Sequence, residues 1–426
     1  MIYTICWAPL EKEVIQILIV EATVRFEEPQ GTPGILNELG YNDQTWDLPW
    51  NQARGQLTSG ERMPSYIFEP VGKADALDRG TELDVESLTV MDPLSQQPML
   101  FEEFLNRRVN SDALLISHRG KVVYEKYFNG MRESDQHLCH SCTKTLTTMQ
   151  IGIAIQDGLL DPKRFVYEFV PDLAGIAAWA DVTVQHVLDM ATGIKSDEHY
   201  EHSDSMYYTY ARGVGYWGPD TNLGVLKFVE ENLTTKECEP GTLFNYASYN
   251  TNLFPLILEA VYGIPAAQLY EEKLYRKIRP EFPALLNTDA FKSPIVEGHL
   301  NLSLRDFHRW GHLLANGGRN LQGEQVIPEE WVTESVRRDS SLDEAFARSE
   351  YAELFPGGSY HNQLWRPDAE GGVCTMLGIY GQFYYIDLVN EIEIVGFSSY
   401  PELSSALMAV QMQELWRTVT EALNSR

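Results

Sequence analysis

Ser141-Cys142-Thr143-Lys144 opens a predicted helix that runs to Asp157 and ends at Gly158, a residue that favours the left-handed turn after a helix. Because three positions make just under one helical turn, Ser141 and Lys144 would share one face of that helix. A serine hydroxyl is a weak nucleophile until a neighbouring base takes its proton. An amine can do so when burial and a helix N-terminus lower its pKa. Ser141 is therefore a candidate nucleophile with Lys144 as its partner. The alternative for this motif alone is an N-cap serine followed by a surface lysine.

The composition limits the size of the core and the kinds of binding partner. A chain of 426 residues with 44% hydrophobic residues can bury one large core or two smaller ones. Its 61 acidic and 33 basic residues give a net charge of −28, and the acidic excess is spread along the chain. Nucleic acids and anionic membrane surfaces both require a basic binding surface. We therefore expect no nucleic-acid partner and no membrane partner.

Cysteine usage and the first residues predict the cellular compartment. The chain has five cysteines, an odd number, and it lacks the two C-x-x-C pairs that could together hold a metal. Reduced thiols of this kind are typical of cytosolic proteins. The apolar start of residues 1–20 is interrupted by Glu11, Lys12 and Glu13, and no basic segment leads into a continuous apolar one. Since the apolar runs are also far shorter than a membrane span, we predict a cytoplasmic location.

The order of the predicted elements indicates an α+β fold. Residues 1–75 contain one expected strand, 14–20, and are otherwise rich in Pro, Gly and Asn, so we expect an irregular N-terminal extension. Residues 76–426 would form the main domain, with a mainly helical insert at about 165–300. This order predicts an antiparallel sheet that is assembled from both ends of the domain and flanked by helices. The expected strands are 113–117, 121–125, 361–365, 375–378, 382–388 and 391–397, and the expected helices are 101–109, 141–157, 252–261, 302–316 and 403–423.

Two further segments carry groups that can move a proton or bind an oxyanion. Asn245-Tyr246-Ala247-Ser248 leads into a predicted helix, and a tyrosine there can relay protons when a nearby lysine lowers its pKa. Gly378-Ile379-Tyr380-Gly381-Gln382 opens a predicted strand, whose backbone N–H groups can face a developing oxyanion. Taken singly, the first segment also fits an ordinary half-buried tyrosine. The second also fits a simple bulge or turn between two strands.

Taken in this order, the three segments resemble the motifs of the serine β-lactamase-like hydrolases. The similar branch holds class C β-lactamases, esterases and 6-aminohexanoate-dimer hydrolases. Residues 141–144 resemble the family's Ser-x-x-Lys, residues 246–248 its Tyr-x-Asn or Tyr-x-Ser, and residues 378–382 its strand-borne third element. The resemblance begins near residue 100 and implies a β-lactamase/transpeptidase-like fold. Segments that resemble the sequences framing these motifs are 155–161, 184–193, 303–306 and 317–318.

The resemblance also implies roles for individual residues. Ser141 would attack an amide or ester carbonyl, and Lys144 and Tyr246 would together take its proton and return it to the leaving group. The N–H groups of Ser141 and Ile379 would form the oxyanion hole, and water would then release the acyl group. No cofactor and no metal is implied. Candidate substrate-binding residues, two of them from a tyrosine-rich loop that also fits a plain surface loop, are Tyr200, Asp204, Ser248, Gly378 and Tyr380.

Two departures from the family pattern weigh against a β-lactam substrate. The third element has no lysine that could hold the carboxylate of a β-lactam, and Ser248 stands where penicillin-recognising relatives usually carry Asn. The implied activity is hydrolysis of small amides or esters, similar to that of 6-aminohexanoate-dimer hydrolases or carboxylesterases. A β-lactamase, a D-amino-acid peptidase and a catalytically silent ligand-binding protein stay open as alternatives. The sequence also leaves open whether the chain forms a homodimer.

His308 and His312 have the spacing of two metal ligands on one helix face. The position after His308 is Arg309, where the zinc motif His-Glu-x-x-His carries glutamate. We therefore expect both histidines to lie on a solvated surface. The same interpretation applies to His199 and His202, which lie in the tyrosine-rich loop.

Overall fold

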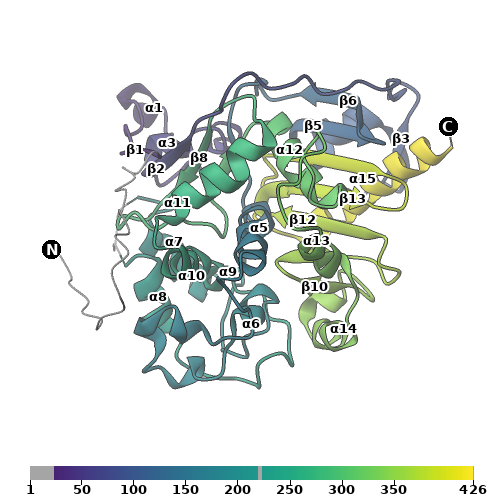
Figure 1. Cartoon of the computed structure of the whole chain (residues 1–426). Helices are drawn as coiled ribbons and strands as arrows, with labels where there is room; N and C mark the ends of the chain where they lie inside the picture. The colour runs from purple at the N-terminus through teal and green to yellow at the C-terminus, as the bar shows by residue number, and fades with distance from the viewer. Residues whose placement is uncertain (1–23, 219–222, 426) are drawn as a thin grey trace.

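The computed structural model describes residues 24–218 and 223–425 (Figure 1). The expected strand at 14–20 lies outside these residues. Within them, no single helix is long and apolar enough to cross a membrane. One bent pair, Ser248–Tyr262 with Ala266–Ile278, reaches that length and composition across an angle of 87°.

A seven-stranded antiparallel sheet forms the centre of the molecule. Its strand order is β10-β11-β12-β13-β14-β5-β6, so strands from the C-terminal third continue directly into a hairpin from the N-terminal third. The junction is the pairing of β14 with β5, in which Ile394 lies opposite Ile116. The predicted α+β class, with an antiparallel sheet built from both ends of the domain, is confirmed. The strands are β5 Ser111–His118, β6 Lys121–Tyr127, β10 Ser359–His361, β11 Leu364–Arg366, β12 Val373–Gly378, β13 Gln382–Asp387 and β14 Ile392–Ser398.

Both faces of this sheet are buried, and successive residues of a strand enter different cores. On β5, Leu115 belongs to the larger hydrophobic cluster, whereas Leu114 and Ile116 belong to the smaller one. Side chains alternate across a strand, so two apolar faces require an apolar residue at every position. This explains why Ala113–Ile116 reads as a continuous apolar run.

Helices cover each face of the sheet. The larger cluster includes residues of α5 (Cys142–Gln156) and α12 (Leu304–Ala315). The smaller cluster includes residues of α15 (Ala406–Asn424) and of α4 (Phe101–Phe104). In Figure 1 the sheet lies between α5 and the yellow α15. The start of α5 meets the sheet near the end of β12, and this contact places Ser141.

A second sheet joins segments from distant parts of the chain, in the order β1-β2-β8-β9-β7. Two of its strands come from residues before 75 and two from the segment predicted as a helical insert. The division at residue 75 and the bounds of the insert stay predictions. The strands are β1 Arg25–Glu27, β2 Ser65–Phe68, β7 His137–Leu138, β8 Ala284–Asn287 and β9 Leu300–Leu302, and a separate hairpin pairs β3 Thr89–Asp92 with β4 Gln97–Leu100.

Most remaining helices surround the larger cluster. The prediction of one strand is wrong. The expected strand at 361–365 is broken, because Asn362 and Gln363 take left-handed φ values of 49° and 62° and turn the chain between β10 and β11. The other α-helices are α1 Gly34–Glu38, α2 Gln52–Gly55, α3 Ser59–Arg62, α6 Val184–Leu188, α7 Met206–Val214, α8 Val225–Asn232, α9 Ser248–Thr251, α10 Leu253–Tyr262, α11 Ala266–Leu269, α13 Glu329–Val336 and α14 Ser340–Ala347. Shorter or wider turns are η1 Leu105–Val109, η2 Val166–Glu168, η3 Pro171–Leu173, η4 Ala177–Trp179, η5 Tyr270–Leu274, η6 Tyr275–Ile278, η7 Glu350–Ala352 and η8 Ile379–Gly381.

Candidate active site

Ser141 and Lys144 meet at the N-terminus of α5. His140 takes a left-handed φ of 45°, which turns the chain from β7 into the helix and leaves Ser141 at its N-cap. The Nζ of Lys144 lies 2.7 Å from the Oγ of Ser141 and also donates to the carbonyl oxygen of Glu297 at 2.7 Å. The Lys144 side chain is 1% exposed. The expected placement of both residues on one helix face is therefore confirmed.

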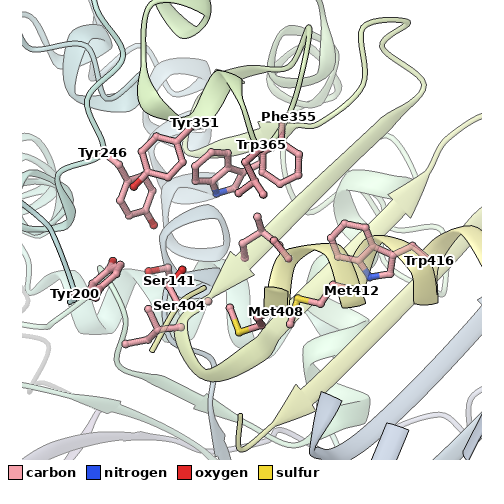
Figure 2. Close-up of a pocket in the computed structure, with 15 residues that line it drawn as sticks. Ser141, Tyr200, Tyr246, Tyr351, Phe355, Trp365, Ser404, Met408, Met412 and Trp416 are labelled. Carbon is pink, nitrogen blue, oxygen red and sulfur yellow. The ribbon is translucent and has the colours of Figure 1, made fainter. Parts of the chain in front are cut away.

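Tyr246 completes this group from a different element. It lies just before α9, on a loop held by a hydrogen bond from the N–H of Asn245 to the carbonyl oxygen of Met190. The side chains of Ser141 and Lys144 both lower the pKa of Tyr246, as expected when its hydroxyl lies close to both groups. Its buried ring lies 5.0 Å from the Nζ of Lys144. In Figure 2 the ring of Tyr246 lies on the same side of the pocket as Ser141 and Tyr200.

Two buried glutamates near Lys144 were not predicted from the sequence. The carboxylate of Glu297 lies 3.8 Å from the Nζ of Lys144 and accepts hydrogen bonds from the hydroxyls of Tyr210 and Tyr216. Glu198 accepts from the N–H and the hydroxyl of Ser248, at 2.5 Å each. Glu198 also accepts from the hydroxyl of Tyr200, at 2.7 Å. Neither glutamate belongs to a recognisable motif, although Ile295-Val296-Glu297 places an acid directly after two apolar residues.

These carboxylates reverse the expected titration of Lys144. Burial alone would lower the pKa of Lys144, but the charges of Tyr246, Glu297 and Glu198 outweigh burial and raise it. The expectation of a depressed lysine pKa is therefore wrong. Burial raises the pKa of Tyr246 despite the opposing charge of Lys144. Burial likewise raises the pKa of Glu297 to about 7, against the same lysine. The neighbouring carboxylates thus favour the ammonium form of Lys144, which would have to lose a proton before it could accept one.

The third element reaches Ser141 because it carries a glycine. A Cβ on Gly378 would lie 2.8 Å from the carbonyl oxygen of Cys139 and 3.0 Å from the Cβ of His140. Any larger residue would push the end of β12 away from the start of α5. Gly378 and Ile379 consequently line the same cavity as Ser141. Ser141 and Ile379, the two residues expected to supply the oxyanion hole, therefore line one cavity.

The remaining candidates for substrate binding divide into two groups. Tyr200 lines the cavity beside Ser141. Ser248 is buried and directs its hydroxyl to Glu198. Asp204 lies on an exposed part of its loop, outside the cavity lining. Tyr380 takes a left-handed φ of 59° and turns its ring toward Trp46 and Asp47, away from the cavity. The fold therefore brings Tyr200 and Gly378 to the cavity at Ser141 but not Asp204 or Tyr380.

The cavity at Ser141 extends well beyond the polar groups (Figure 2). Its volume is about 90 Å³. Among the described residues, 24–218 and 223–425, no Asp, Glu, Lys or Arg side chain lines it. The lining residues are Ser141, Tyr200, Tyr246, Tyr351, Leu354, Phe355, Trp365, Leu377, Gly378, Ile379, Ser404, Met408, Ala409, Met412 and Trp416.

The expectation for His308 and His312 is wrong, because both are buried between α12 and the sheet. His312 hydrogen-bonds through Nδ1 to the carboxylate of Glu393 on β14, at 2.9 Å. His308 contacts the hydroxyl of Ser117 at 3.2 Å. In the described part of the chain, these two histidines and Glu393 are the group that brings three potential metal ligands within 4.8 Å of one another. Since His312 and Glu393 already hydrogen-bond with each other, we interpret them as a structural pair. The absence of a metal stays a prediction.

We predict that Glu393→Gln destabilises the protein by about 3–5 kcal/mol, the usual result of breaking a buried charged pair. Burial would raise the pKa of Glu393, but His312 brings it down to about 2. Glu393 in turn raises the pKa of His312, against burial. The carboxylate therefore contributes stability above its unfolded value of 4.5, and His312 contributes below its unfolded value of 6.5. Denaturant unfolding should show the largest difference between these two pH values.

Glu391→Gln is the matched control for this measurement. Glu391 is exposed and lies two positions earlier, in the turn that precedes β14. Its substitution should change the free energy of unfolding by less than about 0.5 kcal/mol. Equal effects of the two substitutions at every pH would contradict the buried pair.

Comparisons with known proteins place this fold and site in a class. A model of the family described as Beta-lactamase matches residues 98–410. A 6-aminohexanoate-dimer hydrolase from Paenarthrobacter ureafaciens is 32% identical over 293 residues, which cover 68% of this chain and 73% of the relative. The solved structure named "Putative 6-aminohexanoate-dimer hydrolase from Bacillus anthracis" has a TM-score of 0.77 at 23% identity, over 90% of this chain and 97% of that one. A family VIII carboxylesterase has a TM-score of 0.53 at 14% identity, over 75% of this chain and 96% of that one.

The protein is a serine hydrolase of amide or ester bonds with a β-lactamase/transpeptidase-like fold. The matched family model spans well over half of its residues, and the identity to the Paenarthrobacter ureafaciens protein extends over most of both chains. This chain belongs to the beta-lactamase family. The resemblance inferred from the three motifs is therefore confirmed.

Proposed function

We propose that Ser141 is the nucleophile of an acyl-enzyme mechanism, with Lys144 and Tyr246 as its proton-transfer partners. The observation that carries this proposal is the 2.7 Å contact between the Nζ of Lys144 and the Oγ of Ser141 at the end of a cavity. Such a contact lies within the reach required for general acid–base catalysis. The hydroxyl of Tyr246, whose pKa both residues lower, offers a path for the proton.

The proposed reaction has two steps, acylation of Ser141 and hydrolysis of the acyl-enzyme. In the first, the Oγ of Ser141 bonds to the carbonyl carbon, and the bond to the leaving nitrogen or oxygen breaks. The proton of Ser141 passes through Tyr246 and Lys144 to the leaving group. In the second step, water attacks the acyl-enzyme, returns a proton to Ser141 and releases a carboxylic acid. The N–H groups of Ser141 and Ile379 stabilise the oxyanion in both steps.

We propose a small amide or ester as the substrate. The 32% identity to a 6-aminohexanoate-dimer hydrolase favours an amide of that kind. The cavity favours a neutral ester, since no charged side chain lines it. A β-lactamase or D-amino-acid peptidase activity is less well supported, because a substrate carboxylate would find no lysine or arginine in that lining. We also propose a cytoplasmic location, supported by free thiols at Cys139, Cys142, Cys238 and Cys374.

We expect a chromogenic cephalosporin to be hydrolysed with a kcat/KM about 10- to 100-fold below that of a short nitrophenyl ester. The reason is that a carboxylate left without a partner in a desolvated site loses about 1–3 kcal/mol of binding. The measurement compares the cephalosporin, the ester and the 6-aminohexanoate dimer in one buffer. A cephalosporin value above both others would replace our proposal with a β-lactamase. If the protein hydrolyses none of the three substrates and is not labelled by a fluorophosphonate, it is a catalytically inactive ligand-binding protein.

A further inference from the structure

One end of the cavity at Ser141 is apolar and lies far from the proton-transfer groups. On α15, Met408, Met412 and Trp416 are spaced four residues apart, so they form one stripe along the helix. Figure 2 shows this stripe leading away from Ser141, with Phe355 and Trp365 across the cavity from it. The cavity therefore continues from the nucleophile along a wall of apolar side chains.

This wall is built where the two hydrophobic cores meet. Met408, Met412 and Trp416 belong to the smaller cluster, whereas Phe355 and Trp365 belong to the larger one. Side chains that are anchored in two packed cores hold a fixed shape. A carboxylate or an ammonium group would lose its hydration here without gaining an ionic partner from the lining. The wall therefore favours binding of a hydrocarbon chain and disfavours binding of a charged group.

The far end of the cavity is closed by three side chains. Leu354, Phe355 and Trp416 line this cavity and also line a separate groove on the outside of α15. The outer groove differs in character, since Arg417 and Glu421 lie along it and bond to each other. The three side chains thus form a partition between an apolar interior and a charged exterior.

We propose that the apolar end binds an uncharged hydrocarbon arm of the substrate, and that the partition of Leu354, Phe355 and Trp416 sets the longest arm that fits. This inference rests on the proposed function, because the arm must be joined to the bond that Ser141 attacks. The arm is either the acyl chain or the alkyl chain of the leaving group. In both cases the recognition is the same burial of methylene groups.

The test measures kcat/KM for two series of neutral esters. One series varies the acyl chain from acetate to dodecanoate with a constant nitrophenyl group, and the other varies a straight-chain alcohol on a constant acetyl group. We expect kcat/KM to rise about fourfold per methylene in one series, as burial of a methylene predicts, and then to fall once the arm reaches the partition. A rise in the first series identifies the acyl chain, and a rise in the second identifies the leaving group.

Variants test the wall itself. Trp416→Ala removes part of the partition, so the preferred arm should become longer by several methylenes. Met408→Trp narrows the cavity and should lower the ratio of the octyl to the shortest ester at least tenfold. Val410→Trp is the matched control, since Val410 lies on the same helix, is 40% exposed and lies outside the cavity lining. It should leave the chain-length profile unchanged.

The failure of this inference can be told from the failure of the proposed function. Suppose that the wild-type protein hydrolyses nitrophenyl acetate but that kcat/KM does not rise with chain length in either series. The proposed binding of a hydrocarbon arm is then wrong, whereas the proposal that Ser141 is the nucleophile is unaffected. If Ser141→Ala hydrolyses the acetate at the wild-type rate, the proposed function is wrong. A profile that Val410→Trp and Met408→Trp change equally would also overturn the inference, because the effect would then not come from the cavity.

Discussion

Ser141→Ala should lower kcat by about a million-fold, the loss that removal of the nucleophilic serine causes in a serine protease. The reason is that the acyl-enzyme cannot form without the Oγ, and Lys144 then has no hydroxyl to deprotonate. The variant should also lose all covalent labelling by a fluorophosphonate. Intact-protein mass spectrometry measures the labelling, and a nitrophenyl ester measures the rate.

Ser404→Ala is the matched control for this experiment. Ser404 lines the same cavity but lies on the segment before α15. Its substitution should leave the stoichiometry of labelling at one phosphonate per chain. If the phosphonate is found on Ser404 or on another serine of the wild-type protein, Ser141 is not the nucleophile.

Lys144→Met should lower kcat/KM by about 10²–10⁴-fold, the usual contribution of a positioned acid–base group. Tyr246, Glu297 and Glu198 raise the pKa of Lys144. The wild-type rate should therefore increase with pH above neutrality, as Lys144 and the groups coupled to it lose a proton. The variant lacks this ammonium and should lose that part of the profile. A pH–rate profile of both proteins measures the difference.

Fluorophosphonate labelling separates chemistry from folding in this variant. The Oγ of Ser141 is still present, so labelling should reach completion, but slowly. The thermal midpoint of the variant, measured near pH 5, checks that Glu297 and Glu198 tolerate the loss of the cation. Wild-type activity and an unchanged pH profile would remove Lys144 from the mechanism.

The three motifs could be found in the sequence because each depends on local spacing. Ser141 and Lys144 lie one turn apart on one helix, and Gly378 lies at the end of an expected strand. Their meeting around one cavity does not follow from spacing and entered through the family resemblance. The strands β5 and β13 were also foreseeable, since their apolar runs are bounded by turn residues.

The errors on Lys144 and His312 have a different cause, since each depends on residues that are distant in the chain. Glu297 is 153 positions from Lys144, and nothing near Lys144 indicates that a carboxylate will raise its pKa. His312 is buried because Glu393, 81 positions away, supplies the partner that a solvated histidine would find in water. Tyr380 leaves the cavity because its own left-handed backbone turns its side chain to the other side.

The pairing of β14 with β5 has a consequence for how the protein is made. Ser117 and Glu393, which hydrogen-bond across this junction, are separated by 276 residues. At about 5–20 residues per second, roughly 15 to 55 s pass between the synthesis of these two strands. During that time the hairpin of β5 and β6 exposes an apolar edge, and β12 does not yet exist to meet Ser141. The nascent chain therefore needs protection from aggregation, and hydrolysis begins only after its last third has left the ribosome.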